Sequence, residues 1–199
     1  MTTDMTDVEL AWKNAFNVQD KYKTMSVEEI KKCADSDRLP YAVVCLNLEK
    51  DINISSIVRT SHAMGAENVF AIGWRKVDAR GMVGCQHYTN YHKIRVTENN
   101  INEVIVSLKD ICEQFGYTPM FSEWNEYSKP LNGKKCTKFI KNHRPLLIMG
   151  NENGGIPDEI MKAFKYKNIF HIKQRGVIRS INVSNASAMM QYKINDILG

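Results

Sequence analysis

The sequence predicts an α/β fold in which helices flank a mostly parallel sheet. From Pro40 onward, short apolar runs alternate with segments whose apolar residues recur at helical spacing. The runs are rich in β-branched and aromatic residues, which is typical of strands buried on both faces. Strands that alternate with helices in this way indicate a parallel sheet with crossover helices.

The first 38 residues differ in pattern from the rest. The segments "DVELAWKNAF" (7–16) and "SVEEIKKCA" (26–34) are polar and favour helix, and Ser26 followed by Glu29 fits a capping box. We therefore expect a helical N-terminal extension over residues 1–38 and one larger domain over residues 39–199.

The larger domain contains four apolar runs that predict strands and three periodic segments that predict helices. The expected strands are "YAVVCL" (41–46), "VFAIG" (69–73), "PLLIMG" (145–150) and "IFHI" (169–172). The expected helices are "NISSIVRTSHAMG" (53–65), "NINEVIVSLKDICEQF" (100–115) and "PDEIMKAF" (157–164), and a further helical run, "AMMQYKI" (188–194), lies near the C-terminus.

Composition excludes several classes of protein. The chain has 199 residues, 43% of them hydrophobic and 25% charged, and a net charge of +5. No apolar run is long enough for a membrane span or a signal peptide, so we expect no membrane association. Five scattered cysteines without a C-x-x-C pair indicate a reduced, cytoplasmic chain without a zinc or disulfide framework. His87 and His92 are too isolated to predict a metal site.

Ligands of parallel sheets bind at the carboxyl ends of the strands, so the loops that follow the strands are the places to look for a site. In the first such segment, Asn53 is a good helix N-cap, and Arg59 falls just off the apolar stripe of the helix. On this segment alone, a solvated helix arginine is the simpler interpretation.

The second segment is "LLIMGNENGGIPDEIM" (146–161), in which a buried strand runs into Gly150 and then into the pair Gly154-Gly155. Glycines here let a ligand approach the backbone closely, and Glu152 lies in the middle of the turn. No G-K-[ST] follows, so the loop is not the phosphate-binding loop of a nucleotide hydrolase.

The third segment is "IRSINVSNASAMMQYKI" (178–194). It carries five hydroxyl or amide side chains within eight positions: Ser180, Asn182, Ser184, Asn185 and Ser187. One capping residue is enough for an ordinary helix, so the excess needs another reason. Small polar side chains let two backbones pack closely while they satisfy orphan N–H groups, as a slot for a flat purine requires.

Together, in this order, the three segments resemble the motifs of the SpoU/TrmH family of RNA ribose 2′-O-methyltransferases, within the SPOUT superfamily. The resemblance covers roughly residues 40 to 198. The matching residues are Asn53 and Arg59 in the first motif, Gly150, Glu152, Gly155 and Ile156 in the second, and Ile172, Gly176, Ser180, Asn182 and Ser184 in the third. This chain departs from the family at Lys173-Gln174, where Pro-Met is common, and at Ile181, where leucine is common.

The resemblance implies a fold, a cofactor and an assembly. It implies a C-terminal deep trefoil knot, S-adenosyl-L-methionine as cofactor, and a homodimer. Small residues in the third segment would then fit where the threaded backbones cross. The implied cofactor-binding residues are Met149, Gly150, Ile172, Ser180, Ile181 and Asn182.

The resemblance also implies the reaction, the transfer of a methyl group to a ribose 2′-hydroxyl of a tRNA or an rRNA. Arg59 is the expected catalytic residue. A guanidinium stays protonated, so we expect it to stabilise the developing alkoxide rather than act as a base. Glu152 is expected to orient Arg59 or to draw the proton away, and Asn53 to fix the start of the helix and contact the substrate or the Arg59 segment.

Two basic segments are candidates for RNA contact. The segment "GWRKVDARG" (73–81) and the neighbouring "CQHYTNYHKIR" (85–95) mix aromatic with basic side chains, and the expected RNA-binding residues are Arg75, Lys76, Arg80 and Lys93. A second basic run, "KPLNGKKCTKFIKNHR" (129–144), is more simply a solvated face.

Two other functions stay open on the sequence alone. One is a catalytically silent RNA-binding or assembly module that keeps the fold, and the other is a methyltransferase that acts on a base. The retained Arg59, Glu152 and Asn182 favour an active enzyme over the silent module.

Overall fold

A seven-stranded sheet forms the centre of the chain. The computed structural model describes residues 18–47, 53–151 and 154–199. The strands are β1 (Leu39–Asn47), β2 (Ala66–Gly73), β3 (Tyr91–Arg95), β4 (Thr118–Ser122), β5 (Lys129–Pro130), β6 (Pro145–Met149) and β7 (Ile169–His171). They lie in the order β3-β2-β1-β6-β4-β7-β5, and each neighbouring pair is parallel. The predicted α/β class and the parallel sheet are therefore confirmed.

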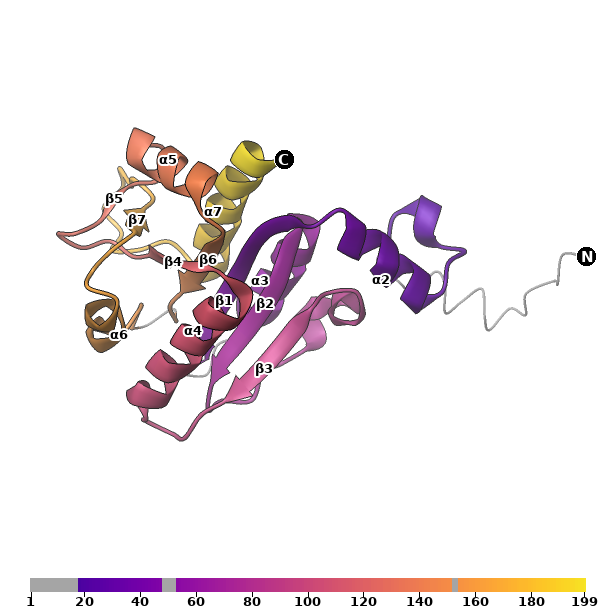
Figure 1. Cartoon of the computed structure of the whole chain (residues 1–199), viewed down its shortest axis with the longest axis horizontal. Coiled ribbons are helices and arrows are strands. Elements are labelled where there is room, and N and C mark those ends of the chain that lie inside the picture. Colours follow the sequence, from indigo (N-terminus) through magenta and orange to yellow (C-terminus); the bar gives the residue numbers. More distant parts are fainter. Residues whose placement is uncertain (1–17, 48–52, 152–153) are drawn as a thin grey trace, which may run out of the picture.

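Helices cover both faces of the sheet (Figure 1). They are α2 (Val27–Ser36), α3 (Asn53–Ala63), α4 (Ile101–Phe115), α5 (Lys134–Asn142), α6 (Asp158–Ala163) and α7 (Val183–Leu198). One buried cluster joins α3, α5 and α7 to one face, and a second cluster joins α4 and α6 to the other. Short 3-10 turns at Asp20–Tyr22, Arg80–Met82 and Cys85–His87 complete the elements.

The position of β1 in the sheet, with helices on both faces, explains why its run of apolar residues is continuous. In β1, Tyr41, Val43 and Cys45 belong to the cluster on the α3 face, whereas Ala42, Val44 and Leu46 belong to the cluster on the α4 face. Successive side chains of a strand point to opposite faces, so a strand covered on both sides needs apolar residues at every position. All four predicted strands form, each within two or three residues of the expected ends.

The sequence did not predict the three strands β3, β4 and β5 or the helix α5. β3 was read only as part of a basic, aromatic segment, α5 as a solvated basic face, and β4 was missed because it is short and contains Pro119. Proline inside a run normally argues against a central strand. The amphipathic α5 does expose its lysines, but it also buries Cys136, Phe139 and Ile140 against the sheet.

The N-terminal extension is described only in part. α2 begins at the predicted capping box, in which Ser26 accepts from the backbone N–H of Glu29 and the Glu29 carboxylate accepts from the N–H of Ser26. The helix lies at the end of the molecule remote from α5 and α6 (Figure 1). The helix expected over residues 7–16 lies outside the described residues.

α7 is fastened to the sheet by a buried polar chain as well as by apolar contacts. The Tyr41 hydroxyl, from β1, donates to the Met64 carbonyl at 3.1 Å and lies 3.3 Å from Gln191 Oε1. Gln191 in turn donates to the Ser187 hydroxyl at 2.9 Å, and the side chains of all three, Tyr41, Ser187 and Gln191, are fully buried. Burial also raises the pKa of Tyr41, so its hydroxyl stays a donor at any ordinary pH.

In the part of the chain that the structure describes, no helix is both long and apolar enough to cross a bilayer.

Replacement of Tyr41 by phenylalanine tests this polar chain. Tyr41→Phe keeps the ring but removes the hydroxyl, so the Met64 carbonyl loses this donor and the buried Gln191 loses the hydroxyl beside its Oε1. We expect the free energy of unfolding to fall by about 1–3 kcal/mol in urea titrations. Tyr127→Phe, at an exposed tyrosine of the loop between β4 and β5, should change it by less than about 0.5 kcal/mol. Equal effects of the two substitutions would contradict this role for Tyr41.

Candidate functional site

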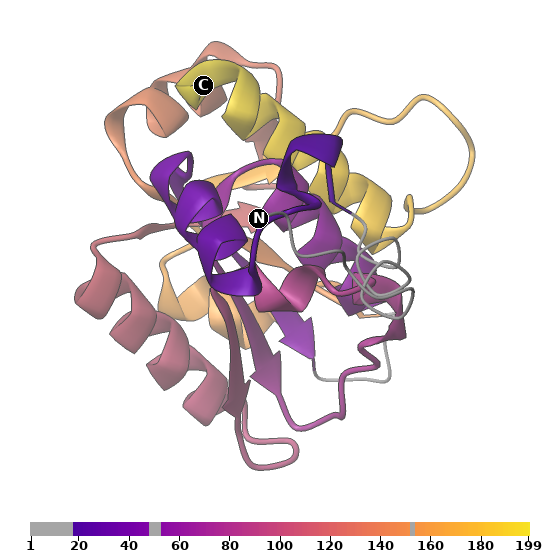
Figure 2. The same ribbon diagram turned by 90° about the vertical axis from the view of Figure 1, so that its right-hand side faces the viewer.

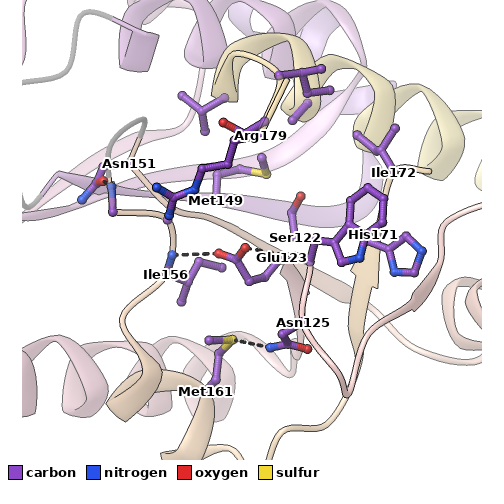
Figure 3. Close-up of a pocket in the computed structure, with 18 of the residues that line it drawn as sticks. Ser122, Glu123, Asn125, Met149, Asn151, Ile156, Met161, His171, Ile172 and Arg179 are labelled. Carbon is purple, nitrogen blue, oxygen red and sulfur yellow. Dashed lines mark hydrogen bonds between the residues drawn. The ribbon is translucent and has the colours of Figure 1, made fainter. Parts of the chain in front are cut away.

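A cavity, here called the main cavity, lies at the carboxyl ends of three neighbouring strands. It has a volume of about 650 Å³ and opens where β6, β4 and β7 end at Met149, Ser122 and His171 (Figure 3). The segment before α7 forms its other wall. This volume falls within the range of small-molecule pockets, and the position is the one that parallel sheets favour for ligands.

The described residues of the glycine loop, 150–151 and 154–156, form one side of the cavity. Asn151 and Gly155 exchange two backbone hydrogen bonds of 3.1 Å, and the Asn151 side chain accepts from the N–H of Gly154 at 2.6 Å. Gly155 has a φ of +64°, which favours glycine. A Cβ on Gly150 would lie 2.2 Å from the Gly155 carbonyl carbon, so a side chain there cannot fit.

Glu123, the residue directly after β4, lies inside the cavity (Figure 3). Its Oε2 accepts from the backbone N–H of Ile156 at 3.0 Å, and its Oε1 accepts from the N–H of Trp124 at 2.9 Å. The carboxylate therefore ties the glycine loop to the end of β4.

An aromatic pair lies at the wall beside β7. The Trp124 and His171 rings stack with their centroids 5.0 Å apart and an angle of 11° between the planes. His171 Nδ1 lies 2.8 Å from the Ser128 hydroxyl, and burial lowers the pKa of His171. A neutral imidazole is thus favoured near pH 7, and one face of the half-exposed Trp124 is left for a ligand.

Asn182, at the start of α7, joins the first motif segment of the sequence to the third. Asn182 caps α7 by accepting from the N–H groups of Ser184 and Asn185, and its Nδ2 donates to Asn53 Oδ1 at 2.9 Å. The two asparagines are 129 positions apart in the chain. Asn53 is the first residue of α3, so this bond brings the ends of two functional segments together.

The predicted cofactor residues largely gather in this cavity. Met149, Gly150, Ile172, Ser180 and Ile181 all line it. Asn182 is not among the lining residues and acts instead as the cap of α7. Glu152 lies outside the described residues, so its expected role stays a prediction.

Arg59 lies elsewhere in the single chain. Its exposed side chain lines a second cavity of about 380 Å³ between α3 and the N-terminal elements, together with Arg38, His62 and Cys85. Burial lowers the pKa of His62 and raises that of Cys85. The structure therefore does not bring Arg59 into the cavity of its own chain that Ser180 and Ile181 line.

The predicted RNA-binding residues lie around the β2–β3 side of the sheet. Arg75 follows β2 and forms an ion pair of 3.2 Å with Glu98, and Arg80 pairs with Asp78 at 2.6 Å. Lys76 is exposed, and the Lys93 ammonium lies 5.6 Å from the centre of the Tyr91 ring. Arg75 and Lys76 share the carboxyl edge of the sheet with the main cavity, whereas Lys93 lies within β3.

Among the residues of the main cavity that the sequence analysis did not mark are Glu123, Trp124 and Arg179. Glu123 and Trp124 follow β4, and without that strand nothing marked "SEW" as a loop at the carboxyl edge. Arg179 lies within the third segment, directly before Ser180, and points toward the glycine loop near Asn151 (Figure 3). A search for charged residues next to the motif serine would have found Arg179.

Comparison with known proteins gives the same family from the sequence and the same fold from the structure. A profile described as the SpoU rRNA Methylase family matches residues 40–192. The tRNA (guanosine(18)-2'-O)-methyltransferase of Escherichia coli (strain K12) is 28% identical over 158 residues, which cover 78% of this chain and 63% of that protein. The chain thus spans less than two thirds of the length of this relative.

Solved structures share the architecture. The A. aeolicus TrmH/SpoU tRNA modifying enzyme matches 86% of this chain and 84% of its own, with a TM-score of 0.63 and 19% identity. The SpoU methyltransferase AviRb from Streptomyces viridochromogenes, solved in complex with the cofactor AdoMet, matches 80% of this chain and 58% of its own, with a TM-score of 0.57 and 20% identity. At these identities, the likeness establishes the fold.

The close approach in the glycine loop gives a direct test. Gly150→Ala places a methyl group against the backbone of Gly155, which cannot yield as a flexible side chain would. We expect a fall of about 1–3 kcal/mol in the free energy of unfolding, as for other overpacked positions. Gly176→Ala is the matched control, because nothing lies within 4 Å of a Cβ there. An unchanged urea midpoint for Gly150→Ala would show that the loop is not held as described.

Proposed function

Because the chain belongs to the SpoU rRNA Methylase family, we propose that it transfers a methyl group from S-adenosylmethionine to a ribose 2′-hydroxyl of a structured RNA, a tRNA or an rRNA. The main observation in support is the cavity at the ends of β6, β4 and β7, where five of the six residues predicted to bind the cofactor come together. The relative from Escherichia coli carries the name of a 2′-O-methyltransferase of tRNA, which supports the same reaction class.

The residues of the cavity fit this cofactor. Gly150 and Gly155 let a ligand lie against the backbone, and apolar side chains such as Met149, Ile172 and Ile181 suit a purine. Arg179 is the single lysine or arginine in the described lining, whereas triphosphate sites need several cations, so a nucleoside without phosphates fits best. S-adenosylmethionine, when bound, supplies a methyl group that its positively charged sulfur already activates.

The remaining task of the protein is to make the 2′-oxygen a better nucleophile, and Arg59 suits it. Its permanent charge stabilises a developing alkoxide and can grip a neighbouring phosphate. Arg59 is remote from the cavity of its own chain, so we propose that it acts at the cavity of a second copy, in a homodimer. Glu152 orients this arginine, and Asn53 fixes the start of α3 through its bond to Asn182.

An exposed apolar surface supports the homodimer. Met189 and Tyr192 lie one turn apart on the outer side of α7, and Val177 and Ile178 lie in the segment that leads into the helix. Figure 2 shows that this segment projects from the body of the molecule. Four large apolar side chains on one element and the loop before it form a patch that a second copy would cover.

RNA contact is proposed for Arg75, Lys76, Arg80 and Lys93. Arg75 and Lys76 follow β2 at the carboxyl edge, so phosphates held there would pass near the cavity. The ion pairs of Arg75 and Arg80 with acidic neighbours are exposed and therefore weak, so phosphates can compete for both guanidinium groups. The five cysteines, all of them in the described part of the chain, form no disulfide, which suits the reducing cytoplasm where such RNAs are found.

Two structural features belong to the same proposal. We expect the segment before α7 to pass through an earlier loop and form a deep trefoil knot, which is rare among proteins. Contacts of α7 with both α3 and α5, and the bond between Asn182 and Asn53, support this path. We also expect residues 1–38 to act as an extension separate from the methyltransferase domain, residues 39–199.

Arg59→Ala tests the catalytic proposal. With purified protein, labelled S-adenosylmethionine and unmodified tRNA or rRNA, we expect the rate of methyl transfer to fall by about 10²–10³, because one preorganised charge is lost. Binding of RNA and of S-adenosylmethionine should stay within about threefold of the wild type. A fall of less than tenfold with binding intact would rule out the catalytic role of Arg59.

A mixing experiment tests whether Arg59 acts across the dimer. Arg59→Ala copies keep the cavity, and Gly150→Ala copies keep Arg59, so a mixed dimer contains one complete site. After subunit exchange of equal amounts, about a quarter of the wild-type activity should return, because half of the dimers are mixed and each has one working site. If no activity returned while mixed dimers were present, the shared site would be wrong.

A further inference from the structure

Glu123 is held more firmly than an ordinary loop carboxylate. Its backbone N–H donates to the Phe170 carbonyl at 3.2 Å, and each carboxylate oxygen accepts one backbone N–H, from Ile156 and from Trp124. Gly155 packs against it so closely that a Cβ there would lie 2.6 Å from Oε2. The side chain is thus fixed in position before any ligand arrives.

The carboxylate of Glu123 keeps unused hydrogen-bond acceptor positions on the side that faces the cavity. An ionised carboxylate has about four acceptor positions, and the two backbone bonds occupy one on each oxygen. Among the described residues, no lysine, arginine or histidine forms an ion pair with Glu123. Arg179 reaches the same cavity but points toward the glycine loop (Figure 3).

We propose that Glu123 binds the two ribose hydroxyls of the cofactor and thereby excludes nucleosides that carry a phosphate on either of these hydroxyls. This inference rests on the proposed function. Two adjacent hydroxyl groups on a rigid ring present two donors side by side, which match the two oxygens of a fixed carboxylate. Charge-assisted hydrogen bonds of this kind are stronger than neutral ones. A phosphate on either hydroxyl would bring a second negative charge against Glu123, which has no neutralising partner among the described residues.

A purely structural role for Glu123 makes a different prediction. If the carboxylate only braced the glycine loop, its replacement would weaken every ligand of the cavity by the same factor. If it reads the hydroxyls, its replacement weakens only ligands that have them. Measuring the Kd of two proteins for two ligands distinguishes the structural role from the binding role. Such a thermodynamic cycle isolates the interaction between the side chain and the hydroxyl groups.

The experiment compares wild type with Glu123→Gln, which keeps the shape of the side chain and an acceptor for the N–H of Ile156. Calorimetry measures the Kd of the full chain for S-adenosylhomocysteine and for its 2′,3′-dideoxyribose analogue. For wild type, we expect the analogue to bind at least about tenfold more weakly. For Glu123→Gln, the ratio of the two Kd values should fall to less than about threefold. The matched control is Glu126→Gln, an exposed carboxylate of the same loop outside the cavity, which should keep the wild-type ratio.

The outcomes separate the inference from the proposed function. If the ratio of the Kd values for the analogue and for S-adenosylhomocysteine is the same in Glu123→Gln as in wild type, the role of Glu123 is overturned while the proposed function stands. A third ligand, 5′-methylthioadenosine, keeps the ribose but lacks the amino acid, and it should lose affinity in Glu123→Gln by the same factor as S-adenosylhomocysteine. Unchanged affinity for this ligand would assign Glu123 to the ammonium group and overturn the inference. Wild-type protein that binds neither nucleoside would overturn the proposed function as well.

Discussion

The candidate site depends on one close approach of backbone to backbone. Gly150, the first residue after β6, lies so near Gly155 and Ile156 that no side chain fits between them. This contact holds the glycine loop closed and places the N–H of Ile156 where the Glu123 carboxylate can accept it. The ends of β6 and β4 thereby become two walls of one cavity, with their polar groups aimed inward.

A second connection joins the site to the C-terminal helix α7. Asn182 uses its side-chain oxygen to cap α7 and its amide nitrogen to hold Asn53 at the start of α3. One side chain therefore sets both the beginning of α7 and its position against the helix that carries Arg59. The buried chain of Tyr41, Gln191 and Ser187 fixes α7 against β1. With the start and the middle of α7 fixed in this way, the segment before it becomes the remaining wall of the cavity.

The sequence predicted those parts of the fold that depend on local pattern. Continuous apolar runs predicted β1, β2, β6 and β7, since strands covered on both faces need apolar residues at every position. The three motif segments predicted five residues of the cavity. Local residue pattern does not predict the elements whose structure depends on tertiary contacts. β4 contains Pro119 within a short run, and α5 looks like a solvated basic segment although one side of it is buried. Without β4, Glu123 and Trp124 had no visible connection to the site, and Arg59, which a motif does mark, lies at a different cavity of the single chain.

These observations support one proposal, that the cavity at the ends of β4, β6 and β7 holds the donor for methylation of an RNA ribose. The most direct measurement is quantitative mass spectrometry of nucleosides from total RNA of cells with and without an intact copy of this gene. The account predicts the loss of one 2′-O-methylated nucleotide from a tRNA or an rRNA, which returns when the gene is restored. Unchanged levels of every 2′-O-methylated nucleoside, or the loss of a base-methylated one, would contradict it.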